Sequence, residues 1–175
     1  MDQQSLRARQ APLKDRYRTD PQSALITLRA HGALGEGVTC SVETGRALVE
    51  AGLHPATGGS GMAACSGDML LQALVACAGV TMNAVATALA IDVRGRVSAE
   101  GDLDFRGTLG VAKDVPVGFR DVRLRFDIVS SAPPDQLEKL RQLTERYCVV
   151  YQTLKSSPAI TVSLAARGDD GQTSA

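Results

Sequence analysis

The run SGDMLLQALVACAGVTMNAVATALAI, residues 66–91, decides the fold that this sequence predicts. It carries no charged residue from Met69 to Ile91, a length that by itself would be enough to span a membrane. Alanine dominates the run, however, and polar residues such as Gln72 interrupt it, so its apolarity is low for lipid. We therefore expect a helix from about Asp68 to Ile91 that is buried inside a folded protein.

The residues before this run predict how the helix begins. Residues 52–67, GLHPATGGSGMAACSG, are rich in Gly and Pro and indicate a long loop. Ser66 is the expected N-cap, and Asp68 lies in the first turn, where the helix dipole favours a negative charge. The same dipole would lower the pKa of Cys65, which makes that residue an alternative reactive thiol.

Five other segments have the composition or the alternation of half-buried β-strands. They are residues 24–29, 37–43, 93–106, 119–129 and 159–165. We expect the Gly-rich sequence HGALGEG to join the first two as a hairpin, and the third and fourth to pair through the loop at 107–118.

A second helix is expected from the sequence SSAPPDQLEKLRQLTERYC, residues 130–148, which opens with serines, two prolines and an acid. At helical spacing one face is formed by Leu137, Leu140, Thr144, Cys148 and Tyr151. This pattern predicts that Cys148 points toward the core.

The order of elements predicts an α+β domain, because strands and helices do not alternate as they do in a parallel sheet. We expect a flexible extension at 1–23, a single domain at 24–165 and a disordered tail at 166–175, since 175 residues are too few for two comfortable domains. So apolar a helix also needs covering on all sides. A homodimer that buries it is the simplest solution.

Charge and cysteine content exclude several classes of function. Lys plus Arg equal Asp plus Glu at 19 each, so no overall field draws the chain to nucleic acid or to a membrane.

The polar start lacks the apolar run of a secretory signal, and we expect a cytoplasmic protein. Four cysteines without a CxxC pair and only two histidines do not repeat at zinc-site spacing, so we expect no metal and no bound cofactor.

The two expected helices each carry a cysteine, Cys77 and Cys148. Either one alone is explained as a small core residue. Together, SGDMLLQALVACAGVTM and ERYCVVYQTL resemble the two motifs of the OsmC/Ohr superfamily, and the order of elements agrees from about residue 24 to 165. The resemblance implies the OsmC-like fold, in which antiparallel sheets wrap around a central buried helix in an intertwined homodimer.

The resemblance also implies a thiol-dependent peroxidase that reduces organic hydroperoxides. Cys77 would attack the peroxide as a thiolate, Cys148 would resolve the sulfenic acid as a disulfide, and an external dithiol of the lipoyl type would reduce it. Two alternatives keep the same fold. One is a catalytically weak protein that binds a small apolar molecule, and the other is a thiol redox sensor that oxidises once.

Three departures from the family pattern bear on the mechanism. Ser66-Gly67-Asp68 stands where the family has Pro-Glu or Pro-x-Glu, so Asp68 is either a catalytic acid or a helix-dipole residue. Nine residues along a continuous helix put Asp68 about 13 Å from Cys77 along the axis. Tyr151 stands where the family motif has Ser.

The third departure is a missing arginine. The family's arginine links acid and thiolate, but HGALGEG contains none, and Arg29 and Arg46 are the nearest candidates. Burial raises the pKa of a cysteine in an apolar helix, and without a nearby cation or helix N-terminus Cys77 would be mostly protonated at neutral pH. We therefore expect slow peroxidase chemistry.

Overall fold

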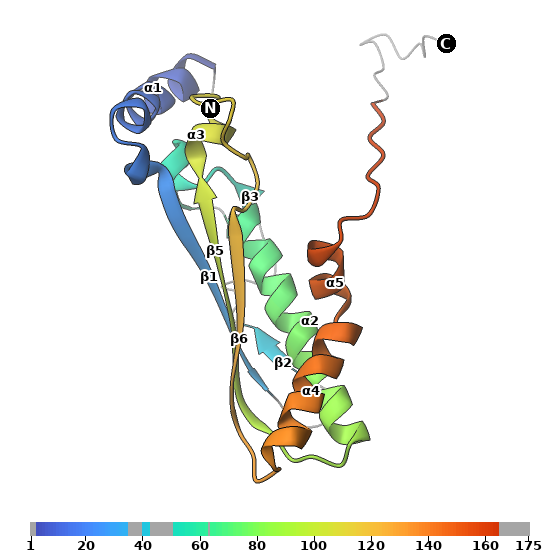
Figure 1. Ribbon diagram of the computed structural model, residues 1–175. Coiled ribbons are helices and arrows are strands. Elements are labelled where there is room, and N and C mark those ends of the chain that lie inside the picture. Colours follow the sequence, from blue (N-terminus) through green and yellow to red (C-terminus); the bar gives the residue numbers. More distant parts are fainter. Residues whose placement is uncertain (1–2, 35–39, 43–50, 63, 165–175) are drawn as a thin grey trace.

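The structure is a computed structural model that describes residues 3–34, 40–42, 51–62 and 64–164 (Figure 1). The described part contains a long antiparallel sheet with strand order β2-β1-β5-β6. These strands are β1 (Leu25–Leu34), β2 (Cys40–Val42), β5 (Arg94–Asp104) and β6 (Asp121–Val129). A short parallel pair is formed by β3 (Ala51–Gly52) and β4 (Ala64–Cys65).

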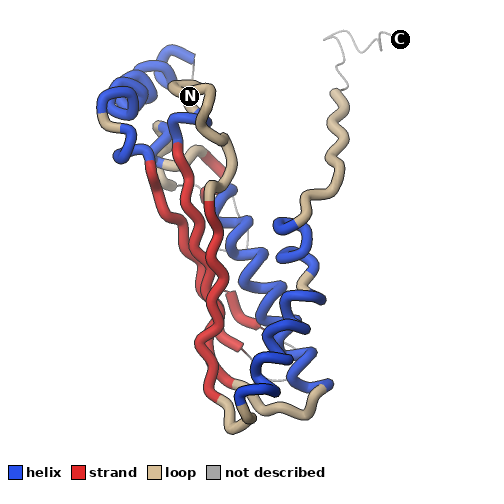
Figure 2. The backbone as a smooth tube through the Cα atoms, in the orientation of Figure 1, coloured by secondary structure: helices blue, strands red, loops and turns tan. Residues whose placement is uncertain are grey.

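Helices lie on one face of the sheet and at its ends (Figure 2). They are α1 (Gln3–Thr19), α2 (Ser66–Ala88), α3 (Phe105–Thr108), α4 (Pro134–Tyr147) and α5 (Val149–Lys155), with short 3₁₀ turns η1 (Pro21–Ala24) and η2 (Pro55–Thr57). The expected α+β class is confirmed. The expected pairing of 93–106 with 119–129 is also confirmed, since β5 and β6 run antiparallel from Arg94 opposite Val129 to Asp102 opposite Asp121.

The central helix α2 has one face in the core and one face exposed. Its inner residues Leu74 and Val75 pack with Val97 and Ala99 of β5. Its outer residues include Met69 and Val80, each 38 % exposed. By length and composition alone α2 could cross a membrane, but in the structure it packs on the sheet and on α4.

The helix begins one residue earlier than the capping pattern predicts. Ser66 is already helical, so its prediction as the N-cap is wrong. Cys65 holds that position in extended conformation and makes no side-chain capping hydrogen bond.

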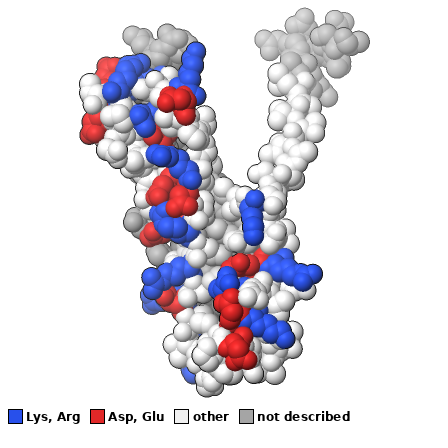
Figure 3. Space-filling model, in the orientation of Figure 1, with Lys and Arg blue, Asp and Glu red and all other residues white. Residues whose placement is uncertain are grey.

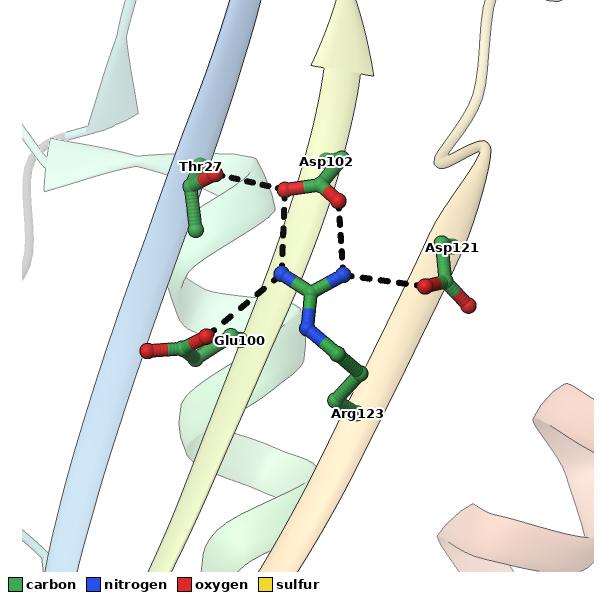
Figure 4. A network of polar contacts seen from close by, with 5 residues as sticks. All are labelled: Thr27, Glu100, Asp102, Asp121 and Arg123. Atoms are coloured by element: carbon green, nitrogen blue, oxygen red, sulfur yellow. Dashed lines mark hydrogen bonds and ion pairs between the residues drawn. The ribbon is translucent and has the colours of Figure 1, made fainter.

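The opposite face of the sheet is charged, because β6 alternates half-buried apolar and exposed residues along its whole length. Figure 4 shows Arg123 on that face, between acids of β5 and β6. Its guanidinium donates to Asp102 at 2.6 and 3.0 Å and to Asp121 at 2.9 Å. The Thr27 hydroxyl of β1 donates to Asp102 at 2.5 Å, so the network ties three strands together.

The N-terminal extension, expected to be flexible, forms the helix α1 instead. The Tyr17 side chain is fully buried, and its hydroxyl donates a 2.6 Å hydrogen bond to the Ala56 carbonyl. Sequence pattern misses this helix because it is polar and contains Pro12. Leu13 also packs against the core, and the Gln10 side chain donates to the Thr57 carbonyl at 3.2 Å, so a few contacts rather than a long apolar stripe hold the helix in place.

The strand expected at 159–165 is not formed over residues 159–164. These residues leave α5 as an extended, exposed arm (Figure 1). Ile160, Val162 and Leu164 expose 81, 87 and 93 % of their surface. A strand needs a neighbour for its backbone hydrogen bonds, and the described protomer offers this segment none. Residue 165 and the predicted disordered tail lie outside the described residues.

The second helix is interrupted at Cys148. Helix α4 ends at Tyr147, and Cys148 adopts an extended conformation with φ −72° and ψ 108°. The Cys148 N–H donates to the Thr144 carbonyl, and the Cys148 carbonyl accepts from the Gln152 N–H, each at 2.9 Å. Cys148 therefore closes α4 and opens α5. The first amides of α5 point out of a helix end without a helical acceptor of their own.

Candidate active site

The structure brings Cys77 and Cys148 together where α2 meets the start of α5. Their side chains share a hydrogen bond, and both are free thiols. Cys77 is half-buried in the middle of α2, whereas Cys148 exposes only 1 % of its surface. The predicted inward orientation of Cys148 is confirmed. Of the two cysteines, Cys77 is the more exposed.

The Cys77 side chain lies near the N-terminus of α5. Burial raises the pKa of its thiol, but hydrogen bonds from the Val150 amide, the Cys148 side chain, the Val149 amide and the Thr81 hydroxyl outweigh burial and hold it below its ordinary value. Burial thus raises the pKa of Cys77 as expected, but the hydrogen bonds, two of them from the start of α5, reverse the net shift. The groups that favour the Cys77 thiolate are therefore hydrogen-bond donors and not a positively charged side chain.

Cys148 is shifted the opposite way. Burial raises the pKa of its thiol, the neighbouring Cys77 raises it further, and the amide of Tyr151 only partly offsets them. The pKa of the Cys148 thiol is about 11. At neutral pH Cys148 is thus a thiol that can donate its proton to a Cys77 thiolate.

Asp68 lies in the first turn of α2, away from the thiol pair. Since α2 is continuous from Ser66 to Ala88, its nine-residue separation from Cys77 corresponds to about 13 Å along the axis. Burial raises the pKa of the Asp68 carboxyl, and the charge of His54 partly lowers it. Its neighbour is therefore an imidazole, not a sulfur. Whether Asp68 takes part in catalysis stays a prediction.

His54, in the loop before α2, makes contacts that are typical of a structural residue. The His54 Nδ1 accepts a 3.0 Å hydrogen bond from the Ala56 N–H, and its ring stacks on Phe105 with centroids 5.1 Å apart. Cys65 is the half-buried N-cap of α2, twelve residues before Cys77 along the helix. The structure therefore separates this alternative thiol from the pair.

The side chains of the two arginines suggested by the sequence lie outside what the structure describes. Arg29 lies in β1, where its backbone is opposite Glu100, and Arg46 lies outside the described residues. Arg106 and Arg123 are engaged by acids, Arg106 through two hydrogen bonds from its Nε and one from its Nη2 to Asp104.

Two features of the site were missed by sequence reasoning. The first is the free amides of Val149 and Val150, which exist only because the chain breaks at Cys148. No Gly or Pro signals that break. The second is Thr81, whose position one turn after Cys77 was readable from helical spacing alone.

An open groove of about 1290 Å³ lies between β6 and the helices α4 and α5. Its apolar lining includes Leu70, Leu74, Val122, Leu124, Tyr151 and Leu154. Leu74 is one turn before Cys77 and Tyr151 is three residues after Cys148, but neither cysteine lines the groove. Charged side chains gather around α4 on the face that Figure 3 presents, while the arm after α5 is free of charge.

Among the residues that the structure describes, no three His, Cys, Asp or Glu side chains lie together as they would around a metal ion. The chemistry that these residues can support directly is that of a paired thiolate and thiol.

Comparisons with known proteins place the chain in a family and a fold. The family model described as OsmC-like protein matches residues 58–163. The structure resembles that of an OsmC-like hydroperoxide resistance protein from Jannaschia sp. CCS1, with 15 % identity, a TM-score of 0.53, and coverage of 84 % of this chain and 96 % of that one. It also resembles an OsmC-like protein from Mycoplasma pneumoniae, with 17 % identity, a TM-score of 0.51, and coverage of 76 % and 86 %. No curated protein matches the sequence.

Proposed function

Because this chain belongs to the OsmC-like protein family, we propose that it is a thiol-dependent peroxidase that reduces organic hydroperoxides. The observation that carries the proposal is the hydrogen-bonded pair of thiols with opposite pKa shifts, Cys77 lowered and Cys148 raised. Reactive thiols are those held as thiolates. The name of the Jannaschia protein, a hydroperoxide resistance protein, supports the same class of chemistry.

The proposed reaction begins at Cys77. Its thiolate attacks the terminal oxygen of the hydroperoxide, the O–O bond breaks, and the alkoxide leaves as an alcohol after taking up a proton. Cys77 is then a sulfenic acid. The sulfur of Cys148 attacks it, water leaves, and a Cys77–Cys148 disulfide forms.

The cycle closes outside the protein. An external dithiol of the lipoyl type gives up two electrons and two protons by two thiol–disulfide exchanges, which restores both cysteines. We place this cycle in the cytoplasm, where a reducing environment keeps the pair as thiols between turnovers.

We also propose that the working form is a homodimer. Two apolar surfaces support it: the outer face of α2, which includes Met69 and Val80, and the uncharged arm from Ala159 to Leu164. Exposed apolar surface on this scale is typical of an interface. Cys77 lies on the same helix as the first of these surfaces, so the second copy would shelter the reacting sulfur from bulk water.

Turnover of cumene hydroperoxide with dihydrolipoamide as reductant tests the activity. The parent protein should turn over, Cys77→Ser should be inactive, and Cys148→Ser should react once and accumulate a sulfenic acid that dimedone traps. Cys65→Ser is the matched control and should retain turnover. If the parent leaves the hydroperoxide unreduced while both thiols stay reduced, the peroxidase proposal is excluded.

A second candidate function is supported by the groove. Its apolar lining beside the thiol pair suits a small apolar ligand whether or not the thiols react. A fluorescent apolar probe should then bind the parent and Cys77→Ser equally, whereas a substrate that reacts at sulfur gives turnover only in the parent. A redox sensor would show one oxidation per thiol pair and no turnover with the dithiol present.

A further inference from the structure

Strand β6 has an edge that no strand of the described part of the chain covers. It is the last strand in the order β2-β1-β5-β6, and within that part only β5 pairs with it. Its nine residues, DVRLRFDIV, include neither Pro nor Gly, which would weaken pairing along it. The unpaired backbone groups of such an edge form a template for a further strand.

The inner face of β6 is only partly covered. Val97 and Ala99 of the neighbouring strand β5 are fully buried in the core that α2 forms with the sheet. The inward residues of β6 are instead half-buried, and all of them line the groove between this strand and the helices α4 and α5: Val122, Leu124, Phe126 and Ile128. The groove therefore continues the apolar face of the sheet beyond the part that α2 covers.

The arm after α5 has the pattern of a strand that fits beside this edge. Its large apolar residues are Ile160, Val162 and Leu164, and the hydroxyl residues Thr161 and Ser163 stand between them. Because side chains alternate between the two faces of a strand, the apolar ones would face the groove while the hydroxyls face the charged side of the sheet. At about 3.3 Å per residue the six residues of the arm span about 20 Å, less than the length of β6.

The charges of the arm and of the groove are compatible. The arm carries no charge, so it brings none into the apolar part of the groove, where an unpaired charge would be costly. Two charged groove residues on α4, Glu138 and Arg141, already pair with each other at 2.6 Å. They therefore require no charged partner from the segment that fills the groove.

The arm does not lie on this edge in its own protomer. Helix α5 ends at Lys155, and Pro158 directly precedes the arm. Proline fixes its own φ and favours an extended residue before it, so residues 156–158 carry the chain onward rather than back. Figure 1 shows the arm running clear of the sheet beyond the end of α5, and all of its residues are exposed. An edge that accepts this arm therefore belongs to a second copy.

We propose that the arm of each protomer adds as a further strand to the β6 edge of a second copy, with Ile160, Val162 and Leu164 in the groove of that copy. The exchange is reciprocal, so two arms and two grooves join one symmetric dimer. Backbone hydrogen bonds along the edge supply affinity, and the alternating side chains set the register. The inference deepens the proposed homodimer, on which it rests, by naming the segments that meet.

Sedimentation velocity of the full chain over a range of concentrations tests the arm. Val162→Asp places a charge on the groove side and should weaken dimerisation about tenfold or more, because the carboxylate would be buried without a partner. Thr161→Asp, the matched control, places the same charge on the opposite side and should dimerise like the parent. Both residues are exposed in the protomer, so neither substitution disturbs its fold. If Val162→Asp dimerises like the parent, or both variants weaken equally, the inference is overturned and the homodimer stands.

Photo-crosslinking locates the arm. The crosslinking residue p-benzoylphenylalanine replaces Ile160 in one preparation and Leu164 in another, and ¹⁵N-labelled and unlabelled copies of each are mixed so that subunits exchange. Mass spectrometry should find crosslinks from the arm of one isotope to residues 121–129 of the other. Crosslinks that never combine the two isotopes, or that join the arm to another surface, overturn the inference.

The oligomeric state of the parent separates this inference from the peroxidase proposal. A parent that stays monomeric at every concentration overturns both the homodimer and the arm exchange. Turnover of cumene hydroperoxide by that monomer would leave the peroxidase proposal standing. A dimer with the expected crosslinks but without turnover would support the arm exchange and exclude the peroxidase.

Discussion

Cys77 and Cys148 share one hydrogen bond, yet the pKa of Cys77 is lowered and that of Cys148 is raised. The opposite pKa shifts follow from the different surroundings of the two thiols. Cys77 faces the free amides of α5, while Cys148 is buried beside a neighbour that carries the negative charge. Of the two residues, the more exposed one, Cys77, therefore ionises at the lower pH.

This arrangement predicts the pH dependence of the reaction with peroxide. Because the reactive form is the thiolate and the pKa of Cys77 lies below its ordinary value, the rate should rise with pH and level off below the region of about 8.5 where a free cysteine titrates. Stopped-flow measurement of sulfenic acid formation from pH 5 to 9 tests this. A midpoint at or above that of free cysteine would contradict the lowered pKa.

The shared hydrogen bond predicts a difference between two substitutions of Cys148. Cys148→Ser keeps an O–H donor, so the alkylation midpoint of Cys77 should stay near that of the parent. Cys148→Ala removes the donor and should raise the midpoint by a few tenths of a pH unit or more. Equal midpoints in the two variants would show that Cys148 contributes nothing to the thiolate.

The outer face of α2 predicts where a single charge disrupts the homodimer. Val80 is 38 % exposed in the protomer, and burying an arginine there without a partner is costly. Val80→Arg should therefore convert dimer to monomer in light scattering coupled to gel filtration. Val117→Arg, at an exposed loop residue, is the control and should remain dimeric. A parent that is already monomeric would refute the dimer proposal.

The buried carboxylate of Asp104 predicts unequal roles for two arginines. The Arg106 Nη2 lies 2.5 Å from Asp104 Oδ2, whereas the Arg120 Nη1 lies 3.7 Å from the same oxygen. Arg106→Ala leaves a buried charge without its main partner, so it should lower Tm by several degrees, and Arg120→Ala should change it little. Equal losses in the two variants would contradict this difference.

Asp104 also predicts how stability responds to acid. Its hydrogen bond with Arg106, outweighing burial, lowers the pKa of the carboxyl. A lowered folded pKa adds stability above the unfolded pKa of about 4 and loses it as pH falls through the folded value. Asp104→Asn should therefore flatten the dependence of Tm on pH below about 4. An unchanged slope would rule out this linkage.

Gly101 of β5 lies so close to the Phe119 ring that we expect it not to tolerate a side chain. A Cβ on Gly101 of β5 would lie 2.5 Å from the Phe119 Cε1, too close without a shift of the ring. Gly101→Ala should lower the free energy of unfolding by about 1–3 kcal/mol, the usual loss from overpacking. Gly118→Ala meets no atom within 4 Å and is the control. Urea denaturation of both variants makes the comparison.

The elements with strong local signals could be predicted from the sequence. The uncharged run predicted helix α2 to within a few residues at each end. The alternation of apolar and polar residues predicted β5, β6 and their pairing. Elements that depend on distant contacts could not. Helix α1 is held by the buried Tyr17, and residues 159–164 have strand composition but no neighbour in the described protomer.

The pair of thiols was predictable, but its electrostatics were not. Helical spacing put Cys148 on the core side, and the structure agrees. The direction of the Cys77 shift depends on a chain break that removes Cys148 from the helix and frees two amides, and nothing in the residue types at 147–150 marks that break.

The break at Cys148 also divides the chain into a stiff and a compliant segment. Helix α4 is anchored by the buried Leu140 and Thr144, whereas α5, all of whose residues are described, has no buried side chain. If the proposed disulfide forms, the two sulfurs must come within about 2 Å of each other. Because α5 has no fully buried side chain, we expect oxidation of the pair to displace α5 more than α4.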